Sequence, residues 1–224
     1  MSRPMNAYER GLNHLHLRLV EMGEKVGHMI HLTTESLVDQ DVLKAKHVIA
    51  EDQRIDDIDY EIERRALELL SLQQPTEKDL RYLMGVMRAN RDLERVADYC
   101  GDIAEITIKM KQLGSYFKPL VDLPKMGYRC EEMLQKVVLA FAQRDERLAR
   151  DVRDMDDLVD DLFEHLQTEL IARMKEDPAV VDQSTQLALA SRYYERIGDH
   201  IVNVSKMVIY VTTGERHPFR HASY

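Results

Sequence analysis

The sequence contains no tryptophan and few of the residues that interrupt helices. Its 224 residues include only 9 glycines and 6 prolines, and aromatic residues make up 6%. Sheet-rich proteins usually need frequent turns and many aromatic or β-branched residues, so this composition disfavours them. The 32% of charged residues instead suits long amphipathic helices. We therefore predict an all-α fold, in a chain long enough for two domains.

The sequence also lacks the features of membrane-spanning, secreted and nucleic-acid-binding proteins. No apolar run approaches the roughly 18 residues that span a bilayer, and the first residues contain no apolar signal-peptide core. The 31 basic residues form no block and are outnumbered by 40 acidic ones, which gives a net charge of −9. We expect a cytoplasmic protein that binds cations or basic protein surfaces, and no nucleic acid.

Motifs of the common metal, redox and catalytic sites are missing as well. Cys100 and Cys130 are far apart and form no CxxC pattern, and Cys100 falls on an apolar helix face, which predicts a buried, reduced thiol. The sequence has no Glu-x-x-His motif of di-iron bundles and no signature of a common enzyme class. We interpret His28 and His31 as surface histidines without a carboxylate partner at ligand spacing.

Apolar residues recur every three or four positions in six segments, which predicts six helices. Turn and capping signals separate the segments, including Thr76 with Asp79 and Asp177 with Pro178, and Gly214 is expected to end the last helix. The expected helices cover about residues 5–38, 42–72, 76–113, 120–142, 146–175 and 178–213. Breaking residues after the third helix place the domain boundary between residues 114 and 115.

The second half of the sequence repeats the first. Met22-Gly23 corresponds to Met126-Gly127, and Ile55-Asp56-Asp57-Ile58 corresponds to Val159-Asp160-Asp161-Leu162 at the same offset. Such a duplication predicts two related units, and short loops make neighbouring helices antiparallel. We therefore expect one three-helix bundle at residues 1–114 and a second at residues 115–224.

Each half contains two rows of carboxylates at one-turn spacing, one on its second helix and one on its third. Residues four positions apart lie on the same face of a helix. The second half has fewer acids, because Phe163 replaces Asp59 and Asn203 replaces Asp102. The candidate metal ligands are Asp52, Asp56, Asp59, Glu94, Asp98, Asp102, Asp156, Asp160, Glu195 and Asp199.

These rows favour metal binding over a plain solvated surface, which is the alternative interpretation. Like charges one turn apart repel each other, and the rows lack the alternating lysines of a typical solvated helix face. Small residues beside the third-helix rows, Ala97, Gly101 and Gly198, would let a neighbouring helix approach closely. Ligand sets made only of oxygen favour Mg²⁺, Ca²⁺, Mn²⁺ or iron, with Zn²⁺ less well suited.

The duplicated motifs resemble those of the PhoU family, the accessory and regulatory proteins of bacterial phosphate transport. Leu93-Glu94-Arg95-Val96-Ala97-Asp98-Tyr99 and Tyr194-Glu195-Arg196-Ile197-Gly198-Asp199-His200 are similar to its paired motifs. The pairs Asp52/Asp56 and Asp156/Asp160 resemble its second acidic motif, and Gly214-Glu215-Arg216-His217 resembles its C-terminal ending. The resemblance extends over nearly the whole chain.

The resemblance implies two tandem three-helix bundles, often a homodimer, and clusters of iron or another metal at the acidic motifs of some members. It also implies a non-enzymatic negative regulator of the phosphate-starvation response, an adaptor between the ATPase subunit of the phosphate ABC transporter and a sensor histidine kinase. The protein would then reach the membrane only through these partners. Because Phe163 and Asn203 bring no charge to a cation, we expect the weaker metal site in the second half.

Two other functions stay open. Clustered carboxylates that hold two cations can activate water, so the alternative function is that of a metal-dependent hydrolase acting on phosphate compounds. The residues supply no evident nucleophile or general base for it. The third possibility is a structural helical protein that binds no metal.

Overall fold

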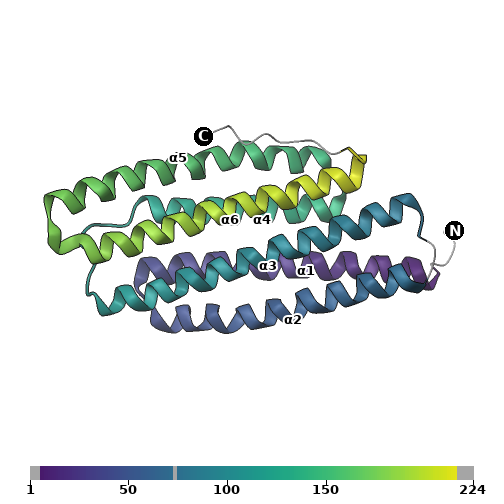
Figure 1. Ribbon diagram of the computed structural model, residues 1–224, viewed down its shortest axis with the longest axis horizontal. Helices are drawn as coiled ribbons and strands as arrows, with labels where there is room; N and C mark the ends of the chain where they lie inside the picture. The colour runs from purple at the N-terminus through teal and green to yellow at the C-terminus, as the bar shows by residue number, and fades with distance from the viewer. Residues whose placement is uncertain (1–5, 73–74, 216–224) are drawn as a thin grey trace.

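The structure, a computed structural model, describes residues 6–72 and 75–215, and within these ranges all regular secondary structure is helical. Helices α1, α2 and α3 form one three-helix bundle and α4, α5 and α6 form a second, with a short 3-10 helix, η1 (Pro178–Val180), before α6 (Figure 1). The predicted all-α fold is confirmed. The helices are α1 (Ala7–Asp39), α2 (Val42–Leu72), α3 (Glu77–Gln112), α4 (Asp122–Gln143), α5 (Glu146–Glu176) and α6 (Val181–Thr213).

The predicted capping residues set several helix ends. The Asp79 amide donates to Thr76 Oγ1 at 3.2 Å, and the Asp79 carboxylate accepts from the Thr76 amide, so α3 begins with a capping box. Gly214 ends α6 in the left-handed conformation. Asp177 caps η1 rather than α6. Pro124 lies in the first turn of α4, where its missing amide costs no helical hydrogen bond.

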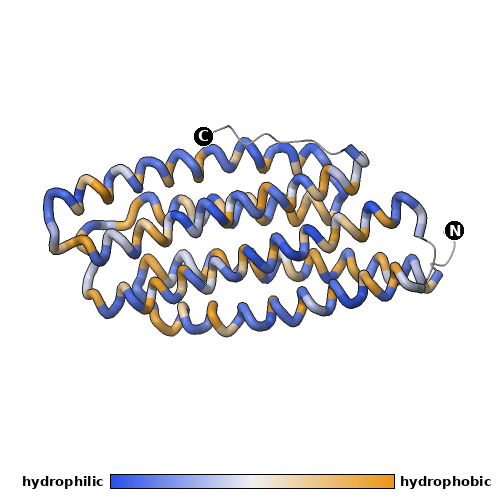
Figure 2. The backbone as a smooth tube through the Cα atoms, in the orientation of Figure 1, coloured by the Kyte–Doolittle hydropathy of each residue, from blue (hydrophilic) through white to orange (hydrophobic). Residues whose placement is uncertain are grey.

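The two bundles lie side by side along their length, with α3 packed along α6 and α1 packed along α4 (Figure 1). Apolar side chains of all six helices form one core, and hydrophilic residues cover much of the outer helix faces (Figure 2). The predicted boundary between residues 114 and 115 falls in the connection from α3 to α4, and the division into two domains stays a prediction.

Parts of the sequence predictions fall on residues that the structure does not describe. Met5, the expected first helical residue, and Arg216 and His217 of the C-terminal motif lie outside the described ranges. Within those ranges, none of the helices is both long and apolar enough to cross a membrane.

A glycine allows α4 to approach α1 closely. A Cβ atom on Gly127 would lie 2.1 Å from Thr34 Oγ1 and 3.0 Å from Thr34 Cβ. Thr34 Oγ1 lies 3.0 Å from the Tyr194 hydroxyl, and the Cys130 thiol donates to the Tyr194 carbonyl oxygen at 3.4 Å. Both cysteines are free and buried, which confirms the prediction for Cys100.

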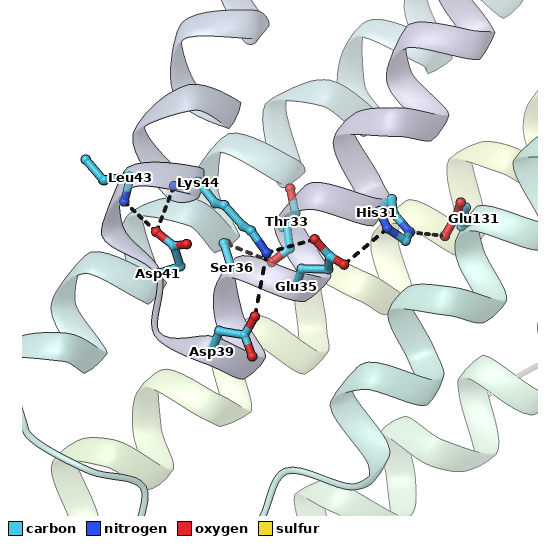
Figure 3. A network of polar contacts seen from close by, with 9 residues as sticks. All are labelled: His31, Thr33, Glu35, Ser36, Asp39, Asp41, Leu43, Lys44 and Glu131. Atoms are coloured by element: carbon cyan, nitrogen blue, oxygen red, sulfur yellow. Dashed lines mark hydrogen bonds and ion pairs between the residues drawn. The ribbon is translucent and has the colours of Figure 1, made fainter.

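A polar network also joins the bundles at this α1–α4 contact (Figure 3). His31 Nδ1 lies 3.0 Å from Glu131 Oε2 on α4, and His31 Nε2 lies 3.4 Å from Glu35 Oε1. Lys44 of α2 donates to Glu35 at 2.9 Å. The prediction that His31 lacks a carboxylate partner is therefore wrong, because Glu35 follows it by one helical turn and the folded chain brings Glu131 beside it.

Replacing Gly127 by alanine is expected to lower the free energy of unfolding by about 1–3 kcal/mol. The added methyl group would overlap Thr34, whose short branched side chain cannot withdraw. Gly27→Ala is the matched control, because its added Cβ would meet only Leu134 Cδ2, at 3.9 Å, and alanine is favoured over glycine in a helix. Urea unfolding of both variants would measure the difference, and equal stabilities would contradict the prediction.

Candidate metal centre

The two acidic rows of the first bundle converge on the seam between α2 and α3. Asp56, Glu94 and Asp98 each place one carboxylate oxygen within 4.8 Å of the others. Asp52 lies near these three acids. Its carboxylate is close enough for their charges, and the charge of Asp102, to act on it. We call the six predicted ligands of this half the N-terminal cluster: Asp52, Asp56, Asp59, Glu94, Asp98 and Asp102.

An open pocket of about 250 Å³ lies at one end of the N-terminal cluster. Asp52, Asp98 and Asp102 line it together with Gly101 and Glu105, an acid that the sequence analysis did not select. Asp52 Oδ2 lies 3.6 Å from the position of a Cβ on Gly101, in agreement with the close approach expected at this small residue. Burial, followed by the charges of neighbouring carboxylates, raises the pKa of Asp52 to about 6.

Two carboxylates of the N-terminal cluster are held by side chains that the sequence analysis missed. Asn90 Nδ2 donates to Asp59 Oδ1 at 2.7 Å, and Arg91 donates to Glu94 Oε1 at 2.7 Å. The position of Arg91 one turn before Glu94 is a sequence signal for its contact, whereas the contact of Asn90 with Asp59 joins two helices and has no such signal. The bonds orient the carboxylates and leave oxygens available for a cation.

The C-terminal cluster comprises Asp156 and Asp160 of α5 with Glu195 and Asp199 of α6. Burial, then the charges of Asp160 and Asp199, raises the pKa of Asp156 to about 7. A Cβ atom on Gly198 would lie 2.4 Å from Asp156 Oδ1, so the glycine is what allows this contact. Among the described residues, no three acids of the C-terminal cluster place oxygens within 4.8 Å of one another.

A lysine lies beside the C-terminal cluster where the first half has an acid. Lys206 is equivalent to Glu105 in the repeat, and its Nζ donates to Asn203 Oδ1 at 2.9 Å. Burial lowers the pKa of Lys206, while the nearby charges of Asp199 and Asp156 act in the opposite direction. The protein's own ammonium group thus supplies positive charge to the C-terminal cluster.

Further differences replace ligands by packing contacts. Phe163, at the position equivalent to Asp59, lies below Arg192, whose guanidinium carbon is 5.5 Å from the ring centroid. Arg192 also donates to Glu195 Oε1 at 2.9 Å, just as Arg91 does to Glu94. The third helices of the two repeats thus share the arginine–glutamate contact, while their ligand sets differ.

The arginine that follows each glutamate pairs within its own helix. Arg95 donates to Asp98 Oδ2 at 2.6 Å. In the second bundle, Arg196 lies 3.8 Å from Asp199 Oδ2. Both arginines therefore form ion pairs on the helix surface, and each reduces the negative charge of its cluster.

Four carboxylate oxygens at equivalent positions of the two halves are buried and accept no hydrogen bond from the described residues. They are Asp52 Oδ1 and Glu94 Oε2 in the first bundle and Asp156 Oδ1 and Glu195 Oε2 in the second. The two glutamate oxygens lie 3.6 Å from Arg95 Nε and 3.8 Å from Arg196 Nε, beyond hydrogen-bond distance. A buried charged oxygen without a hydrogen-bond donor is costly, and a hard cation with oxygen ligands would remove the cost. The residues present therefore fit a metal ion, and the N-terminal cluster fits it better because it has more carboxylates.

The paired bundles and acidic seams define a class of all-helical repeat protein with two candidate metal faces. The sequence model of the family described as "PhoU domain" matches this chain twice, at residues 19–107 and 123–208. The chain belongs to the PhoU family, and the resemblance of its motifs is confirmed.

Relatives from distant organisms match most of the chain. The phosphate-specific transport system accessory protein PhoU homolog of Aquifex aeolicus is 36% identical over 88% of this chain and 89% of its own length. The Clostridium acetobutylicum homolog of the same name is 34% identical over 93% of this chain and 95% of its own length. The crystal structure of PhoU from Pseudomonas aeruginosa is 29% identical, covers 93% of this chain and 100% of its own, and superposes with a TM-score of 0.90.

In metal-free protein, replacing Asp156 by asparagine is expected to raise the free energy of unfolding at pH 8 by about 1–2 kcal/mol. The pKa of Asp156 is about 7 in the folded state against an ordinary 3.8. The unfolded chain therefore releases this proton first, and the wild type loses stability as the pH rises from 3.8 to about 7. A neutral amide removes that loss.

Urea unfolding in EDTA at pH 8 and at pH 4 would measure the effect, which should nearly vanish at the lower pH. Asp157→Asn is the matched control, because Asp157 is the exposed neighbour in the sequence and its loss should change stability by less than about 0.5 kcal/mol. A variant at Asp156 that is less stable than the wild type at pH 8 would show that the carboxylate is not destabilising.

Proposed function

We propose that this protein is a cytoplasmic regulatory accessory protein of phosphate-specific transport, which maintains phosphate homeostasis as a negative regulator of the phosphate-starvation response. The names of its relatives support the link to phosphate transport. The observation that carries the metal-dependent part is the set of four buried carboxylate oxygens, at equivalent positions of the two bundles, that accept no hydrogen bond from the described residues. The protein acts by binding and catalyses no reaction.

The proposed partners are the ATPase subunit of the phosphate ABC transporter and a sensor histidine kinase, with a homodimer as the assembled form. These partners come from the family resemblance, and the acidic seams are compatible with basic partner surfaces. The protein is peripheral to the membrane and reaches it only through them.

The proposed metal ligands are the ten carboxylates of the N-terminal and C-terminal clusters, and the N-terminal cluster is the stronger site. There Asp56, Glu94 and Asp98 already converge, and Glu105 adds an acid to the adjoining pocket. In the C-terminal cluster Lys206 supplies a positive charge that competes with a metal ion. A bound cation would neutralise the negative charge at the seam, and the candidate ions are Mg²⁺, Ca²⁺, Mn²⁺, iron and Zn²⁺.

The alternative function, hydrolysis of phosphate compounds, has less support. Relatives are named as accessory proteins. Among the described residues that line the N-terminal pocket, none is a serine, threonine, cysteine or histidine that could act as a nucleophile. Phosphatase activity that is lost in Asp98→Ala would restore this alternative.

Asp98→Asn is expected to weaken metal binding by about tenfold or more. Loss of a residue that only orients a metal ligand already lowers metal affinity by about tenfold, and Asp98 is a proposed ligand itself. The matched variant Asp199→Asn should have the smaller effect, since Asp199 belongs to the cluster that contains Lys206. Elemental analysis after dialysis against each metal would measure the content. Equal losses in both variants would contradict the proposed order of the two sites.

Removing the metal with EDTA is expected to lower the melting temperature of protein purified with its metal. A ligand at a hundredfold excess over its Kd stabilises the folded state by about 2.7 kcal/mol. The Asp98→Asn variant should lose most of this response. Identical melting with and without EDTA, together with no metal in elemental analysis, would remove the metal from the proposal and leave the adaptor role in place.

Docking through the acidic seams is tested by pull-down with the transporter ATPase subunit and the sensor kinase. The double variant Asp98→Ala/Asp199→Ala is expected to lose both partners. Asp57→Ala/Asp161→Ala removes the same charge from exposed, equivalent positions outside the clusters and should retain them. If the first variant binds like the wild type, the acidic motifs are not the docking site.

A further inference from the structure

A groove between α3 and α6 concentrates positive charge in a protein whose net charge is −9. Its volume is about 310 Å³, and it contains three cations and one carboxylate. Arg88 is exposed and forms no ion pair or hydrogen bond with the other described residues. We call this the basic groove, lined by Arg88, Arg91, Asp92, Asn203, Lys206 and Met207.

The repeat places an equivalent set of residues, the matched set, on the same pair of helices. Each residue of the basic groove has an equivalent in the other half. In the matched set, Tyr193 of α6 and Asp102 of α3 form a hydrogen bond between the two helices. In place of Arg88 the matched set has Leu189, and in place of Lys206 it has Glu105. The full matched set is Leu189, Arg192, Tyr193, Asp102, Glu105 and Ile106.

Three differences between the two sets make the basic groove more positive, and one, Asp92 in place of Tyr193, adds the single carboxylate. A leucine becomes an arginine, an aspartate becomes an asparagine and a glutamate becomes a lysine, while the arginine at Arg91 and Arg192 is common to both. A solvated surface has no reason to collect cations in this way in an acidic protein. The basic groove is therefore suited to an anion.

We propose that the basic groove binds hydrogen phosphate through the side chains of Arg88, Arg91 and Lys206. Guanidinium groups bind phosphate oxygens through parallel N–H···O bonds, and an ammonium group adds a point charge. Asn203 Oδ1 accepts from Lys206, which leaves its Nδ2 group as a further donor into the groove.

The one carboxylate in the groove determines which anion fits. Asp92 Oδ1 lies 2.8 Å from His200 Nδ1, and an ionised carboxylate can only accept hydrogen bonds. Hydrogen phosphate carries a proton that it can donate to Asp92, whereas sulfate has none at neutral pH and would be repelled. The groove should therefore discriminate between two anions of the same shape and charge.

The basic groove and the N-terminal cluster share one side chain. Arg91 lines the groove, and it also donates to Glu94 Oε1 at 2.7 Å. Phosphate binding itself needs no metal, so it is measured on metal-free protein and is independent of the metal proposal.

Isothermal titration of the EDTA-treated full chain with inorganic phosphate, sulfate and AMP tests the proposal at pH 7.5 and low ionic strength. Phosphate should saturate one site per chain, and sulfate should bind at least about tenfold more weakly. AMP presents the same group as a monoester, which is mostly unprotonated at this pH, and should bind more weakly than phosphate. Tighter binding of AMP or equal binding of sulfate would overturn the proposed role of Asp92.

Variants of the lining residues test which side chains bind the anion, and the first of them introduces two residues of the matched set. Arg88→Leu/Lys206→Glu should weaken phosphate binding by about tenfold or more, and Arg91→Gln should weaken it while the equivalent Arg192→Gln leaves it unchanged. Asp92→Asn should bring the phosphate and sulfate affinities close together. Circular dichroism and melting confirm that each variant is folded.

Two results would overturn the proposal: no saturable phosphate binding by the wild type, or undiminished binding by a folded Arg88→Leu/Lys206→Glu variant. Asp98→Asn separates this proposal from the metal proposal, because it should lose metal and retain phosphate binding. If Asp98→Asn loses phosphate binding while the variants of the basic groove retain it, the anion binds near the acidic seam and the assignment to the basic groove is overturned.

Discussion

Carboxylates that are held together at a helix seam repel one another unless a cation lies among them. In both bundles an aspartate of one helix lies beside a glycine of the next, Asp52 beside Gly101 and, more closely, Asp156 beside Gly198. Burial first, and then the charges of the neighbouring acids, raise the pKa of both aspartates. Folding of the seam is thereby linked to binding of protons or cations.

The two halves relieve this repulsion differently. The first keeps its full set of acids, three of which already converge around one point. The second has exchanged acids for Asn203, Phe163 and Lys206, so its own ammonium group offsets part of the charge. A duplicated unit has thus diverged into one seam with only acids at these positions and one that includes its own ammonium group.

Packing of α3 along α6 places these chemically different halves in contact. Tyr99 lies between Tyr193 and His200, with ring centroids 5.5 Å and 5.8 Å away, and His200 contacts Asp92. Arg91 belongs both to the α3–α6 groove and to the contact with Glu94.

Helices, caps, the repeat and the acidic rows could be predicted from the sequence because they depend on residues within a few turns of each other. Glu94 and Asp98 share a face through helical periodicity alone. The contact of His31 with Glu131, the bond from Asn90 to Asp59 and the basic groove depend on how separate helices pack. That packing is set by side-chain shape across positions far apart in the chain, such as Gly127 against Thr34, and only the tertiary structure decides it.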